Sequence, residues 1–128
     1  MWTVPAHRMK ARREHRVPLS DEAIHVLKQM PRIADCDYVF SAPKGGMFSD
    51  MALTSVLRRM GHPDLTQHGF RSTFRDCARE TTSYPREVCE HALAHQLADG
   101  VEAAYQRGDL LVKRTLLMQD WGRFCLTT

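Results

Sequence analysis

The 128-residue sequence lacks the features that mark several other classes of protein. No stretch approaches the roughly 20 consecutive apolar residues that a membrane-spanning helix needs. The N-terminal stretch MWTVPAHRMKARREHRVPLS has no apolar core of the kind found in secretory signals. There is also no internal repeat and no low-complexity tract. We therefore expect one cytosolic domain, because this length is enough for a single hydrophobic core.

The cysteines form no CxxC pair and are scattered along the chain. They are Cys36, Cys77, Cys89 and Cys125. In a reducing compartment such cysteines are thiols, so we expect no disulfide and expect most of the thiols to be buried.

A zinc site is an alternative that the histidines leave open. His91 and His95 stand four residues apart on an expected helix, with Cys77 and Cys89 near in sequence, and HxxxH can chelate zinc. The HExxH pattern is absent, however, because Ala92 follows His91.

Positive charge is concentrated near the start of the chain. The formal net charge is only +3, but the residues from 8 to 16 contain a single acidic residue, Glu14. The basic ones are Arg8, Lys10, Arg12, Arg13 and Arg16. Such a cluster is a candidate phosphate-binding patch, with a solvated charged hairpin as the alternative.

The pattern of strands and helix caps predicts a mainly α fold with a small N-terminal β-hairpin. The short strands WTVP and HRVPL bracket the basic stretch, and the proline in each favours an edge position. A further short strand is expected in DYVF. Helices are expected after Ser20, after Ser49 or Asp50, from Thr66 to about Glu80, after Pro85, after Gly100 and after Asp109.

The helix expected after Thr66 separates into two faces. Phe70, Phe74, Cys77 and Ala78 should point into the core, whereas His68, Arg71, Arg75 and Arg79 form a polar stripe. His68 and Arg71 are neighbours at the helix N-terminus, where free N–H groups also favour an anion. The combination suits a phosphate, and an exposed polar face without a ligand is the alternative.

His95 and Tyr105 become candidate functional residues because of the motifs that precede them in the sequence. His95 and Tyr105 would each be ordinary structural residues in isolation. They follow a lysine in a basic hairpin and an HxxR motif that opens a helix. In this order the sequence resembles the catalytic domain of the tyrosine recombinases, above all the integrases of phages, prophages and genomic islands. The matching stretches are WTVPAHRMKARREHRVPLS, HGFRSTFRDCARE, EHALAHQ, VEAAYQRGD and KRTLLMQDWGRF.

The resemblance implies a role for each matching residue. Tyr105 corresponds to the nucleophile that forms a 3′-phosphotyrosyl intermediate with DNA. Arg71, His68 and His95 correspond to the residues that hold the phosphate, and Lys10 corresponds to the lysine that protonates the 5′-oxygen leaving group. These cations take the place of a metal, so no metal or other cofactor is expected.

The resemblance also implies the partners and a departure from the family pattern. The expected partners are double-stranded DNA, contacted in addition by Arg8, Arg12, Arg13 and Arg75, and further protomers in a tetrameric synaptic assembly. Family members carry another catalytic arginine upstream of the hairpin, and this sequence begins at the hairpin. We therefore expect residues 1–128 to be the C-terminal portion of a tyrosine recombinase catalytic-domain fold, truncated at its N-terminus. Two alternatives stay open: a non-catalytic DNA-binding remnant, and a last helix that packs on a neighbouring protomer rather than on its own domain.

Overall fold

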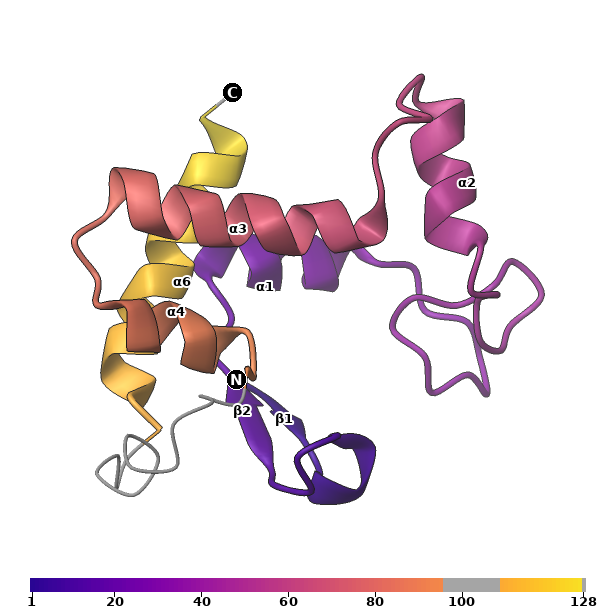
Figure 1. The fold of residues 1–128 in the computed structure, drawn as a ribbon. Helices are drawn as coiled ribbons and strands as arrows, with labels where there is room; N and C mark the ends of the chain where they lie inside the picture. Colours follow the sequence, from indigo (N-terminus) through magenta and orange to yellow (C-terminus); the bar gives the residue numbers. More distant parts are fainter. Residues whose placement is uncertain (96–108, 128) are drawn as a thin grey trace.

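A computed structural model describes residues 1–95 and 109–127 of the chain. Its elements are β1 (Trp2–Val4), the 3₁₀ turn η1 (Ala6–Arg8), β2 (His15–Val17), α1 (Asp21–Gln29), α2 (Ala52–Arg59), α3 (Gln67–Thr81), α4 (Arg86–Ala92) and α6 (Leu111–Leu126) (Figure 1). The fold is mainly helical with one small two-stranded sheet, as the sequence predicts.

The two strands form the expected antiparallel hairpin. Trp2 lies opposite Val17 and Val4 lies opposite His15. The residues between the strands form η1 and an irregular loop, in which Arg12 adopts a left-handed backbone with φ of 53°. The hairpin extends away from the helices, so the basic loop is presented to solvent (Figure 1).

Side-chain caps explain where two helices begin. Ser20 Oγ accepts a hydrogen bond of 3.2 Å from the Ala23 N–H, and Thr66 Oγ1 accepts one of 3.1 Å from the Gly69 N–H. Both oxygens satisfy N–H groups that have no partner within the helix. These caps confirm the predicted starts of α1 and α3.

Two local predictions between these helices are wrong. The N-cap of α2 is Met51, which makes no side-chain cap hydrogen bond, rather than Ser49 or Asp50. The expected strand in DYVF is also absent, and the only pairing nearby is an isolated bridge between Ser41 and Met47. Gly45 and Gly46, both with φ above +80°, turn the chain back so tightly that no longer ladder forms.

The core lies where α6 crosses α1, α3 and α4 (Figure 1). Phe74 of α3, Val88 of α4 and Leu117 of α6 are all at most 6% exposed. Phe74 also meets Trp121 edge to face, with ring centroids 5.3 Å apart. The last helix therefore packs on its own domain. The prediction for Phe70 is wrong, because its side chain is 53% exposed.

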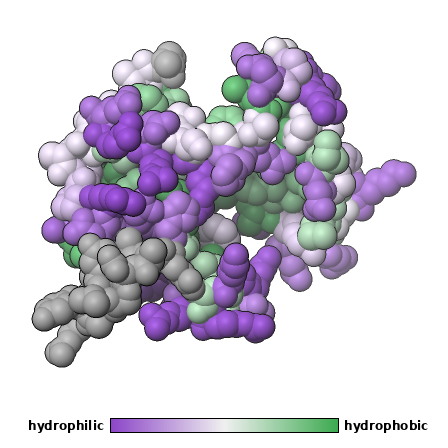
Figure 2. Space-filling view, in the orientation of Figure 1, coloured by the Kyte–Doolittle hydropathy of each residue, from purple (hydrophilic) through white to green (hydrophobic). Residues whose placement is uncertain are grey.

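The segment around α2 stands apart from this core. None of the residues from 21 to 73 is buried. Large apolar side chains are exposed there instead, among them Phe40, Met47, Met51, Leu53 and Met60. Figure 1 shows α2 and the loop before it beside the helical core, and Figure 2 shows apolar surface gathered over this part of the molecule.

The burial of the cysteines differs from the expectation. All four cysteines are free thiols, but only Cys89 is buried, so the expectation that most would be buried is wrong. Among the described residues, no helix has the length and apolar character to cross a membrane.

Candidate catalytic site

Arg71 connects α3 to the end of α4. Its position one turn into α3 follows from the Thr66 cap, which fixes where the helix begins. The side chain is half-buried, and its guanidinium donates a hydrogen bond to the Leu93 carbonyl. Arg71 therefore lies at the point where the chain leaves α4 and approaches His95.

His95 is held by the residues that end α4. Ala94 adopts a left-handed backbone with φ of 53°, a conformation that costs an L-residue about 1–2 kcal/mol. This turn lets the His95 N–H donate to the Glu90 carbonyl at 2.9 Å. The His95 ring contacts the same residue, since Nδ1 lies 2.5 Å from Glu90 Oε2. With Nδ1 occupied, Nε2 is the ring nitrogen left to meet a ligand.

Glu90 is the buried centre of this cluster. It is 5% exposed, and Arg75 Nη2 and Arg86 Nε lie 3.0 and 3.7 Å from its Oε1. Burial by itself raises the pKa of Glu90, but the hydrogen bond from His95 and the charges of Arg75 and Arg86 outweigh it and hold the pKa below its ordinary value. The carboxylate is therefore ionised at neutral pH.

The sequence-based reasoning missed Glu90. Its i, i+4 spacing from Arg86 was the available signal, but such pairs are common on exposed helix faces. Only the packing of α3 against α4, which brings Arg75 to the same carboxylate, distinguishes Glu90 from a surface residue.

The hairpin approaches the same end of α4. Burial and the neighbouring Arg114 lower the pKa of His15 in β2, and a hydrogen bond with the Ala92 backbone opposes them. His15, at the loop end of the two-stranded ladder, is thus close to the last residue of α4. Lys10 lies in the exposed loop beyond it.

The predicted site residues are therefore only partly brought together. Arg71, Arg75 and His95 converge on the end of α4. His68 is exposed in the first turn of α3, and Tyr105 lies outside the described residues. Arg8, Arg12 and Arg13 are exposed between the two strands of the hairpin.

Curated sequences clarify the relationship of this chain to known proteins. Prophage integrase IntA of Escherichia coli is 38% identical over 126 residues, which cover 94% of this chain and 30% of the relative. Prophage integrase IntZ of the same organism is 36% identical over 94% of this chain and 30% of its own length. The integrase of Enterobacteria phage P4 is 31% identical over 97% of this chain and 33% of its own length.

The chain is a homologue of phage and prophage integrases. It spans about a third of the length of these curated relatives. No protein-family model matches the chain, and no solved structure matches it.

Charged side chains also line a hollow beside α4 of this integrase homologue. The hollow measures about 660 Å³ and is lined by Arg75, Arg79 and Arg86 together with Asp76 and Glu90, whereas Arg71 and His95 do not line it. Within residues 1–95 and 109–127, no group of three or more histidine, cysteine or acidic side chains is arranged to hold a metal ion.

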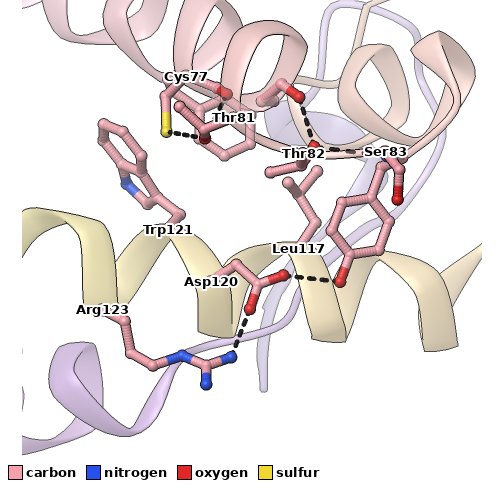
Figure 3. Close-up of a pocket in the computed structure, with 11 residues that line it drawn as sticks. Cys77, Thr81, Thr82, Ser83, Leu117, Asp120, Trp121 and Arg123 are labelled. Carbon is pink, nitrogen blue, oxygen red and sulfur yellow. Dashed lines mark hydrogen bonds and ion pairs between the residues drawn. The ribbon is translucent and has the colours of Figure 1, made fainter.

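A second cavity of the integrase homologue is separate from this cluster. It measures about 510 Å³ and lies between α3 and α6, above an apolar floor that includes Leu117 and Trp121 (Figure 3). Asp120 accepts a hydrogen bond of 2.8 Å from the Tyr84 hydroxyl and also pairs with Arg123. Arg71, His68, His95 and Lys10 do not line this cavity, so it is not the candidate site.

Proposed function

We propose that this chain forms part of the catalytic domain of a tyrosine-type site-specific DNA recombinase, which integrates or excises a prophage or related element. The observation that carries the proposal is the meeting of Arg71 and His95 at the end of α4 in a homologue of integrases. Tyr105 follows His95 by ten residues in the sequence.

The proposed reaction is a phosphoryl transfer without a metal. Arg71, His68 and His95 bind the non-bridging oxygens of a DNA phosphate. The Tyr105 hydroxyl loses its proton to solvent and its oxygen attacks phosphorus, so that a bond from Tyr105 to the 3′-phosphate forms while the bond from phosphorus to the 5′-oxygen breaks. Lys10 gives its proton to the departing 5′-oxygen, and the reverse of these steps rejoins the strands.

The surrounding cations make this reaction feasible near neutral pH. A free tyrosine has a pKa of about 10 and is a weak nucleophile. Cations around the phosphate stabilise the phenolate and the charge that develops on the phosphate oxygens. The covalent intermediate conserves the phosphodiester energy, so rejoining needs no ATP.

We further propose that a second phosphate-clamping arginine comes from polypeptide beyond these 128 residues. The curated relatives are about three times as long as the matching region, which leaves ample chain for that residue. Loss of one such cation costs about 3 kcal/mol of transition-state stabilisation, by analogy with the removal of an oxyanion donor. The isolated chain should therefore bind DNA but cleave it weakly or not at all.

Covalent trapping on a nicked recombination site tests the proposal. The chain would replace the matching 126 residues of E. coli IntA, so that the remainder of an integrase is present. The chimera should form a covalent complex with the DNA, and Tyr105→Phe should abolish that complex while leaving DNA affinity within about twofold.

Tyr38→Phe is the matched control, because Tyr38 is an exposed tyrosine in the loop before α2. It should trap DNA as well as the parent chimera does. Equal trapping by the Tyr105→Phe variant would refute the tyrosine mechanism. Salt-sensitive binding without covalent trapping by any variant would instead favour a DNA-binding module without catalysis.

A further inference from the structure

Arg114 is an unusual member of the core. It is 1% exposed and ranks with Leu117 and Val88 among the side chains that are fully buried. A buried guanidinium is unfavourable unless its charge and its N–H groups are satisfied. Nη1 and Nη2 of Arg114 have hydrogen-bond partners, whereas its buried Nε has none among the described residues, so the partners of the two Nη groups show which segments Arg114 holds together.

Those partners come from two distant parts of the chain. Arg114 Nη1 donates to the Asp109 carbonyl at 3.1 Å and lies 3.9 Å from the Asp109 carboxylate. Arg114 Nη2 donates to the carbonyl of Arg16 in β2. One side chain of α6 is thus bonded both to the hairpin and to Asp109, two residues before the first residue of α6.

Asp109 binds Arg16 as well as Arg114, so these three residues form a junction between the hairpin and the start of α6. Its Oδ2 accepts hydrogen bonds from Arg16 Nε at 3.0 Å and Arg16 Nη2 at 2.5 Å. Its Oδ1 accepts one of 3.2 Å from the N–H of Leu111, the first residue of α6. The N-cap of α6 is nevertheless Leu110 and not the expected Asp109, and Leu110 is held in a left-handed backbone with φ of 52°. A strained residue persists only where its surroundings fix it, which indicates a rigid junction.

On each side of this junction, a residue of the proposed reaction is nearby in the sequence. Arg16 belongs to the hairpin whose loop carries Lys10, and Asp109 follows Tyr105 by four residues in the sequence. The leaving-group lysine and the nucleophile have to act on opposite sides of one phosphorus atom, so the spacing between their supports matters.

We infer that Arg114, together with Asp109 and Arg16, is a positioning cluster that holds the hairpin against the start of α6. It thereby fixes the hairpin whose loop carries Lys10 relative to Asp109 and the start of α6. The part of this inference that concerns catalysis rests on the proposed recombinase function.

Asp109→Asn tests the inference most cleanly. The variant keeps an oxygen that can accept from the Leu111 N–H but removes the charge that binds Arg16 and Arg114. Amide hydrogen exchange in the 128-residue chain should become about tenfold faster in residues 2–17, while exchange in α3 and α4 stays unchanged. Arg114→Lys should produce a similar effect, because one ammonium group cannot reproduce the fork that reaches two carbonyls.

Asp120→Asn is the control. Asp120 has the same side-chain exposure of 37% as Asp109 and also pairs with an arginine, but it lies towards the other end of α6. It should leave hairpin exchange unchanged. Equal exchange in the Asp109→Asn and Asp120→Asn variants would overturn the inference.

A catalytic measurement separates positioning from plain stabilisation. In the IntA chimera, Asp109→Asn should slow covalent attachment at least tenfold at unchanged DNA affinity, whereas Asp120→Asn should not. A loosened hairpin with full trapping would overturn the positioning role. Absence of trapping in the parent chimera would count against the proposed function instead, and hairpin exchange would then decide whether the junction holds.

Discussion

At the scale of single residues, Glu90 determines how the candidate site is organised. Its carboxylate contacts His95, which follows the end of α4, and Arg75, which lies on α3. Neither contact is evident from the sequence. The cations that the sequence predicts as separate DNA contacts are therefore connected through one buried carboxylate. Arg75 is bound to Glu90 before any DNA arrives, so its contact with a phosphate would have to share or replace this pair.

Glu90→Gln should lower the free energy of unfolding by about 1–2 kcal/mol at pH 7, because the amide cannot pair with the cations around it. The estimate is modest because the cationic partners are substantially solvent-exposed. Glu80→Gln is the control, since the Arg79–Glu80 pair lies 3.6 Å apart on the surface and should contribute less than about 0.5 kcal/mol. Urea unfolding of both variants measures the difference.

The difference in stability between the parent chain and Glu90→Gln should also depend on pH, in a direction that the pKa of Glu90 determines. The pKa of Glu90 in the folded state lies below its ordinary value of 4.5. Its ionised form therefore stabilises the fold fully above that value, and the stabilisation is lost as the pH falls through the folded pKa. The advantage of the parent over Glu90→Gln should shrink below pH 4.5. An advantage that grows as the solution is acidified would contradict this assignment.

At the scale of elements, a glycine determines how closely α1 and α6 approach. A Cβ atom at Gly122 would lie 2.5 Å from Ser20 Oγ and 2.3 Å from Glu22 Oε2. Ser20 is buried and caps α1, so it cannot retreat without breaking the cap. Gly122 is thus required by close packing and not by backbone conformation.

Gly122→Ala should therefore destabilise the chain by about 1–3 kcal/mol, as overpacking does, although alanine is the better helix former. Gly69→Ala in α3 is the comparison, because its Cβ would make only an ordinary contact of 3.4 Å with Thr66 Oγ1. That variant should gain up to about 1 kcal/mol from helix propensity. Thermal unfolding of the two variants should show shifts of opposite sign.

The elements also show where sequence patterns were sufficient. The hairpin and the starts of α1 and α3 were predictable because each depends on residues adjacent in sequence, such as the Ser20 and Thr66 caps. Phe70 was misassigned because helical periodicity identifies an apolar face but not whether a neighbouring element covers it. The grouping of Arg71 with His95 followed from a resemblance in motif order, whereas Glu90 and Arg114 required the tertiary contacts themselves.

At the scale of the whole molecule, the basic hairpin loop and the large exposed apolar side chains lie in different regions. The basic loop is at the tip of the hairpin, whereas exposed apolar side chains collect around α2 (Figure 2). A chain with a net charge of only +3 can therefore still have a locally strong positive surface, which under the proposed function is the surface that meets DNA.

Replacement of Arg12 and Arg13 together by glutamine should reduce the salt dependence of DNA binding. The slope of log K against log salt should fall in magnitude by about 1 for each phosphate contact removed. Arg58→Gln with Arg59→Gln makes the same change in charge at the exposed end of α2 and should leave the slope nearly unchanged. Equal slopes for the two double variants, measured by fluorescence anisotropy, would mean that the hairpin loop is not the DNA-contacting surface.

The most direct test of the central claim is to locate the residue that becomes linked to DNA. Trypsin should place Tyr38, Tyr84 and Tyr105 in three different peptides, of residues 33–44, 80–86 and 87–107. Mass spectrometry of the trapped and digested complex of the IntA chimera should find the 3′-phosphonucleotide on the peptide of residues 87–107, attached to Tyr105. Attachment to either other peptide, or to a residue from the IntA portion, would contradict the assignment of Tyr105 as the nucleophile.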